Sequence, residues 1–124
     1  MDKLKELIGA QILKINKDSI TVKLNNNTYT LNLDAYNGDC CGYADFELNM
    51  RYSENDDRNP IITNIEIENK DYYSGDSFVV TFYGENKEIA TIEGSAGSGS
   101  GWTYGACVSI TCSELGLDET LAQY

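Results

Sequence analysis

The side chains most often used in catalysis are scarce in this sequence. None of the 124 residues is histidine, the side chain whose unperturbed pKa lies closest to neutrality. Nucleophile systems that pair serine or cysteine with histidine are therefore excluded. A carboxylate pair could still hydrolyse a glycosidic bond, and the candidates are Asp39, Asp45, Glu47, Glu54, Asp56 and Asp57. With twenty Asp and Glu in the chain, close carboxylates are expected by chance, so we expect that the protein is not an enzyme.

The four cysteines could in principle form a disulfide scaffold or a zinc site. Cys40 and Cys41 are adjacent, and sequence neighbours rarely satisfy disulfide geometry with each other. The spacing contains no Cys-x-x-Cys pair and there is no histidine, which disfavours zinc. We therefore expect reduced thiols, no bound metal and no cofactor, as in a cytosolic protein.

A glycine-rich stretch, Gly94–Gly101, has four glycines and three serines in eight residues. Backbone N–H groups in such loops can surround a phosphate. This stretch lacks the Gly-Lys-Ser/Thr ending of a P-loop. It is better interpreted as a flexible hairpin loop.

The aromatic residues and the two arginines form the candidate ligand-binding set. Arg51 and Arg58 are the only side chains with a planar guanidinium fork for phosphate, although pairing with the acidic residues between them is the simpler interpretation. Phe82, Trp102 and Tyr104 belong to strands expected to be neighbours, where alternate residues share a face and could stack a base. We expect these five residues to bind a nucleotide across a boundary between protomers.

The charge balance is strongly acidic. Nine Lys and Arg against twenty Asp and Glu leave a formal charge of −11, which repels nucleic acid and anionic membranes. We therefore expect no direct binding to either. The acidic surface either serves solubility or imitates a polyanion for a basic partner.

Alternation of apolar residues predicts a β-hairpin near the N-terminus. Ile20, Val22 and Leu24 share one face of a strand, and Tyr29, Leu31 and Leu33 share one face of the next. Asn25–Asn27 lies between the two runs, and asparagine tolerates the left-handed turn conformation. Before this hairpin, Lys3–Ile15 is predicted to be a short helix that continues into a strand at Gly9.

The rest of the chain reads as short strands and surface loops. Asp34–Met50 is predicted to contain a turn followed by a strand or a short helix. A short C-terminal helix is predicted for Ser113–Tyr124, with Ser113 as N-cap. The remaining predicted strands are Ile61–Glu68, a central strand Ser77–Tyr83, Glu88–Glu93 and Trp102–Cys112, with loops at Ser53–Pro60, Asn69–Asp76 and Gly84–Lys87.

These elements predict a single, mainly β domain that spans residues 1–124. The expected architecture is a curved antiparallel sheet or a small sandwich of six to seven strands, with one or two short helices. The longest apolar stretches are far shorter than the roughly 20 residues of a membrane-spanning helix, and no secretory signal is visible. We expect a cytoplasmic protein.

Three segments resemble a family of small bacteriophage and prophage proteins. They are Leu7–Ile12, Gly38–Gly42, where the family has Gly-Asp-Cys-Cys-Ser and Gly42 replaces the serine, and Gly99–Gly105. In length, β content and the aromatic Phe82, the chain is also similar to the Thoeris anti-defence proteins. These sequester cyclic ADP-ribose signals in pockets between protomers.

The resemblance implies a phage-encoded anti-defence protein acting in the cytoplasm of a bacterial host. One hypothesis is that it sequesters a cyclic nucleotide immune signal without reacting with it. The alternative is an acidic protein–protein inhibitor that occupies the nucleic-acid groove of a host nuclease, as anti-CRISPR proteins do. A structural protein of the virion, or a phage accessory domain, is the third hypothesis. We also expect a homo-oligomer, because small β domains often pair through exposed strand edges.

Overall fold

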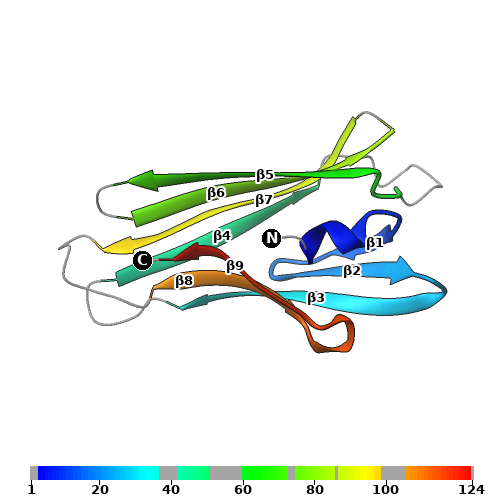
Figure 1. Cartoon of the computed structure of the whole chain (residues 1–124), viewed down its shortest axis with the longest axis horizontal. Helices are drawn as coiled ribbons and strands as arrows, with labels where there is room; N and C mark the ends of the chain where they lie inside the picture. The colour runs from blue at the N-terminus through cyan, green and yellow to red at the C-terminus, as the bar shows by residue number, and fades with distance from the viewer. Residues whose placement is uncertain are drawn as a thin grey trace.

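Two short helical turns and nine strands make up the described parts of the chain (Figure 1). The computed structural model describes residues 3–36, 42–50, 60–72, 75–85, 87–98 and 106–123. The 3₁₀ turns are η1 (Leu4–Leu7) and η2 (Ser113–Leu115), and the strands are β1 (Gln11–Ile15), β2 (Ser19–Leu24), β3 (Asn27–Tyr36), β4 (Gly42–Met50), β5 (Asn64–Tyr72), β6 (Gly75–Gly84), β7 (Lys87–Ser98), β8 (Cys107–Cys112) and β9 (Leu117–Gln123).

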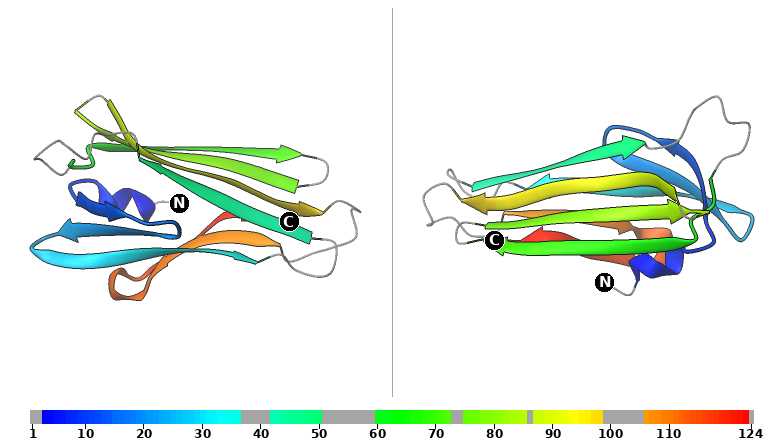
Figure 2. Two further views of the ribbon diagram at one scale, coloured as in Figure 1. Left: turned by 180° about the vertical axis from the view of Figure 1, so that it is seen from behind. Right: turned by 90° about the horizontal axis from the view of Figure 1, so that it is seen from above.

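The strands form two antiparallel sheets that face each other as a sandwich (Figures 1 and 2). One sheet has the order β1-β2-β3-β8-β9 and the other the order β4-β7-β6-β5. The expectation of a mainly β antiparallel fold is confirmed, and of the two expected architectures the chain adopts the sandwich. It has more strands than the six to seven expected.

The β2–β3 hairpin confirms the prediction made from the asparagine run. Leu24 pairs with Asn27, so the turn consists of Asn25 and Asn26, whose φ angles are 52° and 69°. Both residues are left-handed, as a two-residue turn matched to the twist of a hairpin requires. The register then aligns Val22 with Tyr29 and Ile20 with Leu31.

The N-terminal segment also follows its prediction of a helical turn continuing into a strand. Leu4 and Leu7 of η1 are buried, and Gly9 turns the chain with a φ of 100°, a conformation that favours glycine. The backbone N–H of Gly9 donates to the carbonyl of Ile62 at 2.8 Å. This bond ties the N-terminal segment to the chain just before β5.

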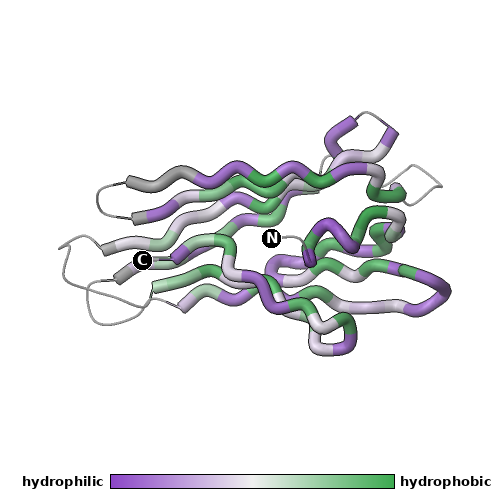
Figure 3. Tube along the Cα trace, in the orientation of Figure 1, coloured by the Kyte–Doolittle hydropathy of each residue, from purple (hydrophilic) through white to green (hydrophobic). Residues whose placement is uncertain are grey.

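Inward-facing residues of the two sheets form one core, as the alternation of hydropathy along the strands indicates (Figure 3). Burial of apolar side chains contributes about 25 cal/mol per Å² removed from water. The five-stranded sheet contributes Ile12, Ile20, Val22, Leu31, Val108 and Ile110, and the four-stranded sheet contributes Ile65, Phe78, Val80, Phe82, Ala90 and Ile92.

Two side chains of the four-stranded sheet form hydrogen bonds with the backbone of β9 in the other sheet. The Asn69 amide Nδ2 donates to the carbonyl of Leu121 at 3.0 Å. The backbone N–H of Gln123 donates to Asp76 Oδ2 at 3.2 Å. These bonds link the edge strand of one sheet to β5 and β6 of the other.

The C-terminal segment is a strand, so the prediction of a helix over Ser113–Tyr124 was wrong. The helical part ends after η2 at Gly116, which has a φ of 66°. The chain then pairs with β8, and Leu117 and Leu121 become buried. A helix of this length is marginal in water, whereas the strand completes the sheet and covers the core.

Three predicted boundaries also differ. The first half of the expected glycine loop, Gly94–Ser98, continues β7 and pairs with β4, and Gly94 to Gly97 also pair with β6. Ile61 forms only an isolated bridge with Gln11, so β5 begins at Asn64, and the strand then extends to Tyr72 into the expected loop. The sequence from Gly42 to Met50 is a strand, while the predicted loop at 53–59 lies outside the described residues.

Within the described ranges, no helix has both the length and the apolar character needed to cross a membrane.

Candidate functional site: the outer face of the four-stranded sheet

The five predicted ligand-binding residues are not assembled by the described parts of the chain. Phe82 points into the core and is 1% exposed, so its ring has no free face for a base to stack on. Arg51, Arg58, Trp102 and Tyr104 lie outside the described residues.

The four strands β4, β7, β6 and β5 lie side by side in the view from above (Figure 2, right). Their register aligns carboxylates across the outer face of this sheet. Glu47 of β4 pairs with Glu93 of β7, Glu93 pairs with Val79 of β6, and Val79 pairs with Glu68 of β5. This row runs across the whole sheet, and all three glutamates are exposed. Like charges directly opposite each other on neighbouring strands destabilise a sheet.

The adjacent rows extend the acidic surface. Asp45 lies in the next row, which ends by register at Lys70, and Glu66 lies in the row on the other side. We call Asp45, Glu47, Glu66, Glu68 and Glu93 together the acidic face.

The outer face of the five-stranded sheet differs in charge. Its register rows are rich in threonine and asparagine. Its exposed charged residues are of both signs and balance each other: Lys14, Lys23, Asp34 and Asp118. Among the described side chains of the two outer faces, negative charge therefore predominates on the four-stranded sheet.

Thr91 is a buried polar residue within the acidic face. It lies two residues before Glu93 on β7, opposite Asn49 of β4 and Thr81 of β6. Its side chain is 4% exposed, and Oγ1 has no hydrogen-bond partner among the residues that the structure describes. An unsatisfied buried hydroxyl is unfavourable by about 1 to 3 kcal/mol.

A polar recess lies at one end of the acidic face. Its volume is about 250 Å³, and it is lined by Thr63, Asn64, Glu66 and Tyr83. The Tyr83 hydroxyl donates to Glu66 Oε2 at 3.1 Å, and Thr63 Oγ1 donates to the Tyr83 carbonyl at 3.2 Å. The hydrogen bond to Glu66 is the main reason that the pKa of Tyr83 is raised, with loss of hydration and the charges of Glu66, Glu88 and Glu68 adding to it.

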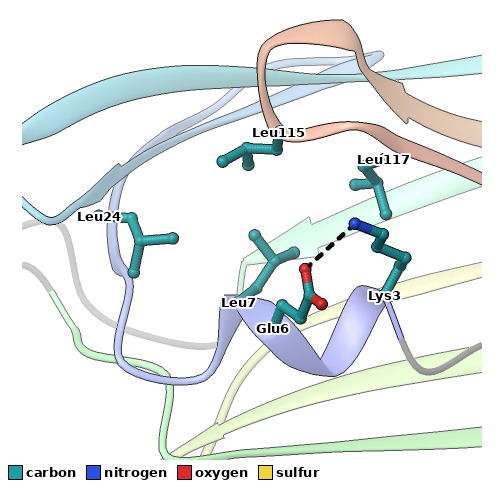
Figure 4. A pocket seen from close by; sticks show the side chains of 6 residues that line it. All are labelled: Lys3, Glu6, Leu7, Leu24, Leu115 and Leu117. Carbon is teal, nitrogen blue, oxygen red and sulfur yellow. Dashed lines mark ion pairs between the residues drawn. The ribbon is translucent and has the colours of Figure 1, made fainter.

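A second hollow lies between η1, the end of β2 and the start of β9 (Figure 4). Its floor is apolar, and an ion pair between Lys3 Nζ and Glu6 Oε2 at 3.7 Å lies at its edge. The lining leucines are Leu7, Leu24, Leu115 and Leu117. A volume of about 40 Å³ is far below the several hundred Å³ of a small-molecule site, so this hollow is a packing gap.

The described thiols and carboxylates give no metal centre. Cys107 is half-buried and Cys112 is buried, and both are free thiols; Cys40 and Cys41 lie outside the described residues. Across the described ranges, no three Cys, Asp or Glu side chains are grouped so that they could hold a metal ion. The chemistry that the acidic face offers is attraction of cationic groups.

The sequence did not lead to a prediction of the acidic face, although it indicates one part of it. On β5, the polar residues Asn64, Glu66 and Glu68 alternate with isoleucines, which predicts one solvent-exposed face. Glu47 and Glu93 are far apart in the chain, and only the register of β4 and β7 brings them together.

No protein-family model, curated protein or solved structure matches the chain. The resemblance to phage proteins therefore stays a prediction, and the function has to be argued from the surface itself.

Proposed function

We propose that this protein acts by binding, and that its acidic face docks on the basic surface of a nucleic-acid-binding protein and blocks access of nucleic acid. The observation that carries the proposal is the unequal distribution of charge between the two broad surfaces. Electrostatic complementarity of this kind steers association and selects the partner.

Solubility alone does not explain this distribution. Charges that keep a protein dispersed serve equally well on either surface, and the five-stranded sheet carries balanced charges instead. Within the row, Glu47 and Glu93 are like charges directly opposed on neighbouring strands, an arrangement that costs about 0.2 to 1 kcal/mol. A basic partner would relieve this repulsion.

Sequestration of a cyclic nucleotide, in the cytoplasm of a phage-infected cell, is the competing proposal. A phosphate that approaches the acidic face meets repulsion, so such a site needs the two arginines. Among the described residues that line the recess at Tyr83, none is cationic, and Arg51 and Arg58 lie outside the described residues. We favour the first proposal because of the acidic face itself.

A binding assay separates the two proposals. Basic proteins captured from a bacterial lysate on the immobilised chain would be purified and tested one by one for direct binding, for displacement by duplex DNA and for salt dependence. We expect a nucleic-acid-binding protein whose affinity falls steeply between 50 and 300 mM salt, because exposed charges are screened.

Charge reversal on opposite surfaces provides the matched control. Glu47→Lys with Glu68→Lys should weaken binding about tenfold or more at low salt, whereas Asp34→Lys with Asp118→Lys makes the same total charge change on the other surface and should have little effect. Equal effects of the two double variants would refute docking through the acidic face. Calorimetric binding of cyclic ADP-ribose isomers or cyclic oligonucleotides, without any basic partner, would favour sequestration.

A further inference from the structure

The recess at the end of the acidic face is built around Tyr83, and a β-bulge sets its composition. Phe82 pairs with Ala90, but the register then shifts, so that Tyr83 pairs with Glu88. Ile89 is the extra residue of the bulge, and its side chain is buried. The bulge therefore places a carboxylate rather than an isoleucine opposite the tyrosine.

The bulge also separates the recess from the flat part of the sheet. Beyond it, the β6–β7 hairpin bends away from the sandwich (Figure 1), as bulged strands do. On its other side Tyr83 pairs with Asn64, and its carbonyl accepts the backbone N–H of Thr63 at 2.7 Å. The tyrosine is thus held between the segment before β5 and the start of β7.

The groups around the recess are suited to one cation. The side chains that line it offer a carboxylate, an amide oxygen, a hydroxyl oxygen and an aromatic ring, and Glu68 and Glu88 are close enough to act on Tyr83 through their charge. The hydrogen bond to Glu66 Oε2 at 3.1 Å holds the phenol in place. This bond is made to Oε2, and Oε1 is the second acceptor oxygen of the same carboxylate.

The size of the recess favours a single side chain over a whole nucleotide. Its volume of about 250 Å³ lies below the range of about 300 to 1,000 Å³ that is typical of small-molecule sites. A guanidinium group is planar, donates several hydrogen bonds in a fixed geometry and stacks on aromatic rings. It therefore matches both the oxygen acceptors and the ring better than an ammonium ion does.

We infer that the recess lined by Thr63, Asn64, Glu66 and Tyr83 binds the guanidinium group of an arginine side chain that a basic partner inserts there. The arginine lies against the Tyr83 ring and donates to Glu66 Oε1, with Glu88 adding negative charge. This inference rests on the proposed function for the source of the arginine. The site itself can be tested with a small probe.

The probe is agmatine, a guanidinium compound with an arginine-like chain, followed by NMR chemical shifts of the ¹⁵N-labelled protein at low salt. Shifts should be confined to Thr63, Asn64, Tyr83 and their neighbours, with a stronger response to agmatine than to 1,5-diaminopentane, which has two ammonium groups. Glu66→Gln should weaken agmatine binding at least fivefold. Tyr83→Phe, which keeps the ring, should weaken it less than Tyr83→Leu, which removes it.

Asp34→Asn is the control, because it removes one exposed carboxylate from the outer face of the other sheet, away from the recess and the acidic face. It should leave the shifts at Thr63 and Tyr83 unchanged. Shifts spread evenly over the acidic face, or equal losses from Glu66→Gln and Asp34→Asn, would overturn the inference. If agmatine binds at the recess but the protein binds no basic protein, the proposed function is refuted and the inference stands.

Discussion

At the scale of single residues, Tyr83 shows a clear effect of folding on ionisation. Its hydroxyl donates to Glu66 Oε2, and this bond, together with lost hydration and nearby carboxylates, raises its pKa above the ordinary value of 10.0. The folded state thus favours the neutral phenol. The stabilisation is fully present below the unfolded pKa and is lost as pH rises through the higher folded pKa.

Absorbance at 295 nm, which reports phenolate, tests this prediction. The difference between the titrations of the unmodified protein and Tyr83→Phe should reveal one phenol that ionises above pH 10. Glu66→Gln should lower that pKa more than Glu68→Gln, because the hydrogen bond to Glu66 is the largest cause and the charge of Glu68 the smallest. Ionisation of Tyr83 at the ordinary pH in the intact protein would show that the bond does not form in solution.

Residue-level reasoning from sequence reached only part of this site. Strand alternation indicated that Glu66 and Glu68 face water, and the structure confirms their exposure. The same reasoning placed Phe82 at a ligand site, but it is buried, because an apolar residue on a central strand of a sandwich faces the core. The role of Tyr83 depends on the bulge beside it, and no local sequence pattern predicts that register shift.

At the scale of elements, Gly94 shows why β7 contains glycines. A Cβ at this position would collide with the carbonyl oxygen of Asp45 and lie 2.9 Å from Phe78 Cε1 and 3.0 Å from Phe46 Cα. Two of these three contacts are with backbone atoms of β4, which cannot move without disturbing its pairing. Gly94 therefore allows a close approach of the strands.

Substitution of Gly94 by alanine should therefore destabilise the fold. Overpacking of this kind lowers the free energy of unfolding by about 1 to 3 kcal/mol, and urea denaturation followed by circular dichroism would measure it. Ser95→Ala is the control, because Ser95 has the next position on the opposite face of the strand, and its effect should stay within about 0.5 kcal/mol. If Gly94→Ala matches this control, β7 does not pack against β4 as described.

Elements with local determinants were predicted well, and those set by distant partners were not. The β2–β3 turn needs only two left-handed asparagines, Asn25 and Asn26. Strand β9 forms because its residues pair with β8 and cover the core. The local signals, an N-cap at Ser113 and acidic residues before Leu121, favour a helix instead, although Gly116 weakens that prediction. Gly94 looks like part of a flexible loop by composition, whereas its actual constraint comes from Asp45, Phe46 and Phe78.

At the scale of the whole molecule, the formal charge of −11 is large, and the described carboxylates on the two sheets are unevenly placed. Exposed carboxylates gathered on one face repel one another, and this repulsion exists only while the sheet holds them together. On the acidic face, folding brings like charges together, and their repulsion lowers the stability of the folded state. On the outer face of the five-stranded sheet, the described charges balance. The same repulsion opposes association of two copies through the acidic face, so the expected homo-oligomer requires another surface.

We therefore predict that added salt stabilises the protein and that the gain comes mainly from the acidic face. The Debye length falls from about 30 Å at 0.01 M to about 8 Å at 0.15 M ionic strength, so most of the rise in Tm should occur within this interval and should be the same in NaCl and KCl. Glu47→Gln relieves the pair with Glu93, so it should raise Tm at low salt and reduce the further gain from salt. Asp34→Gln, on the balanced surface, should do neither. Differential scanning calorimetry across this salt range measures both effects, and a Tm that stays flat to 0.15 M and rises only in molar salt would mean that general salting-out, not repulsion within the acidic face, controls stability.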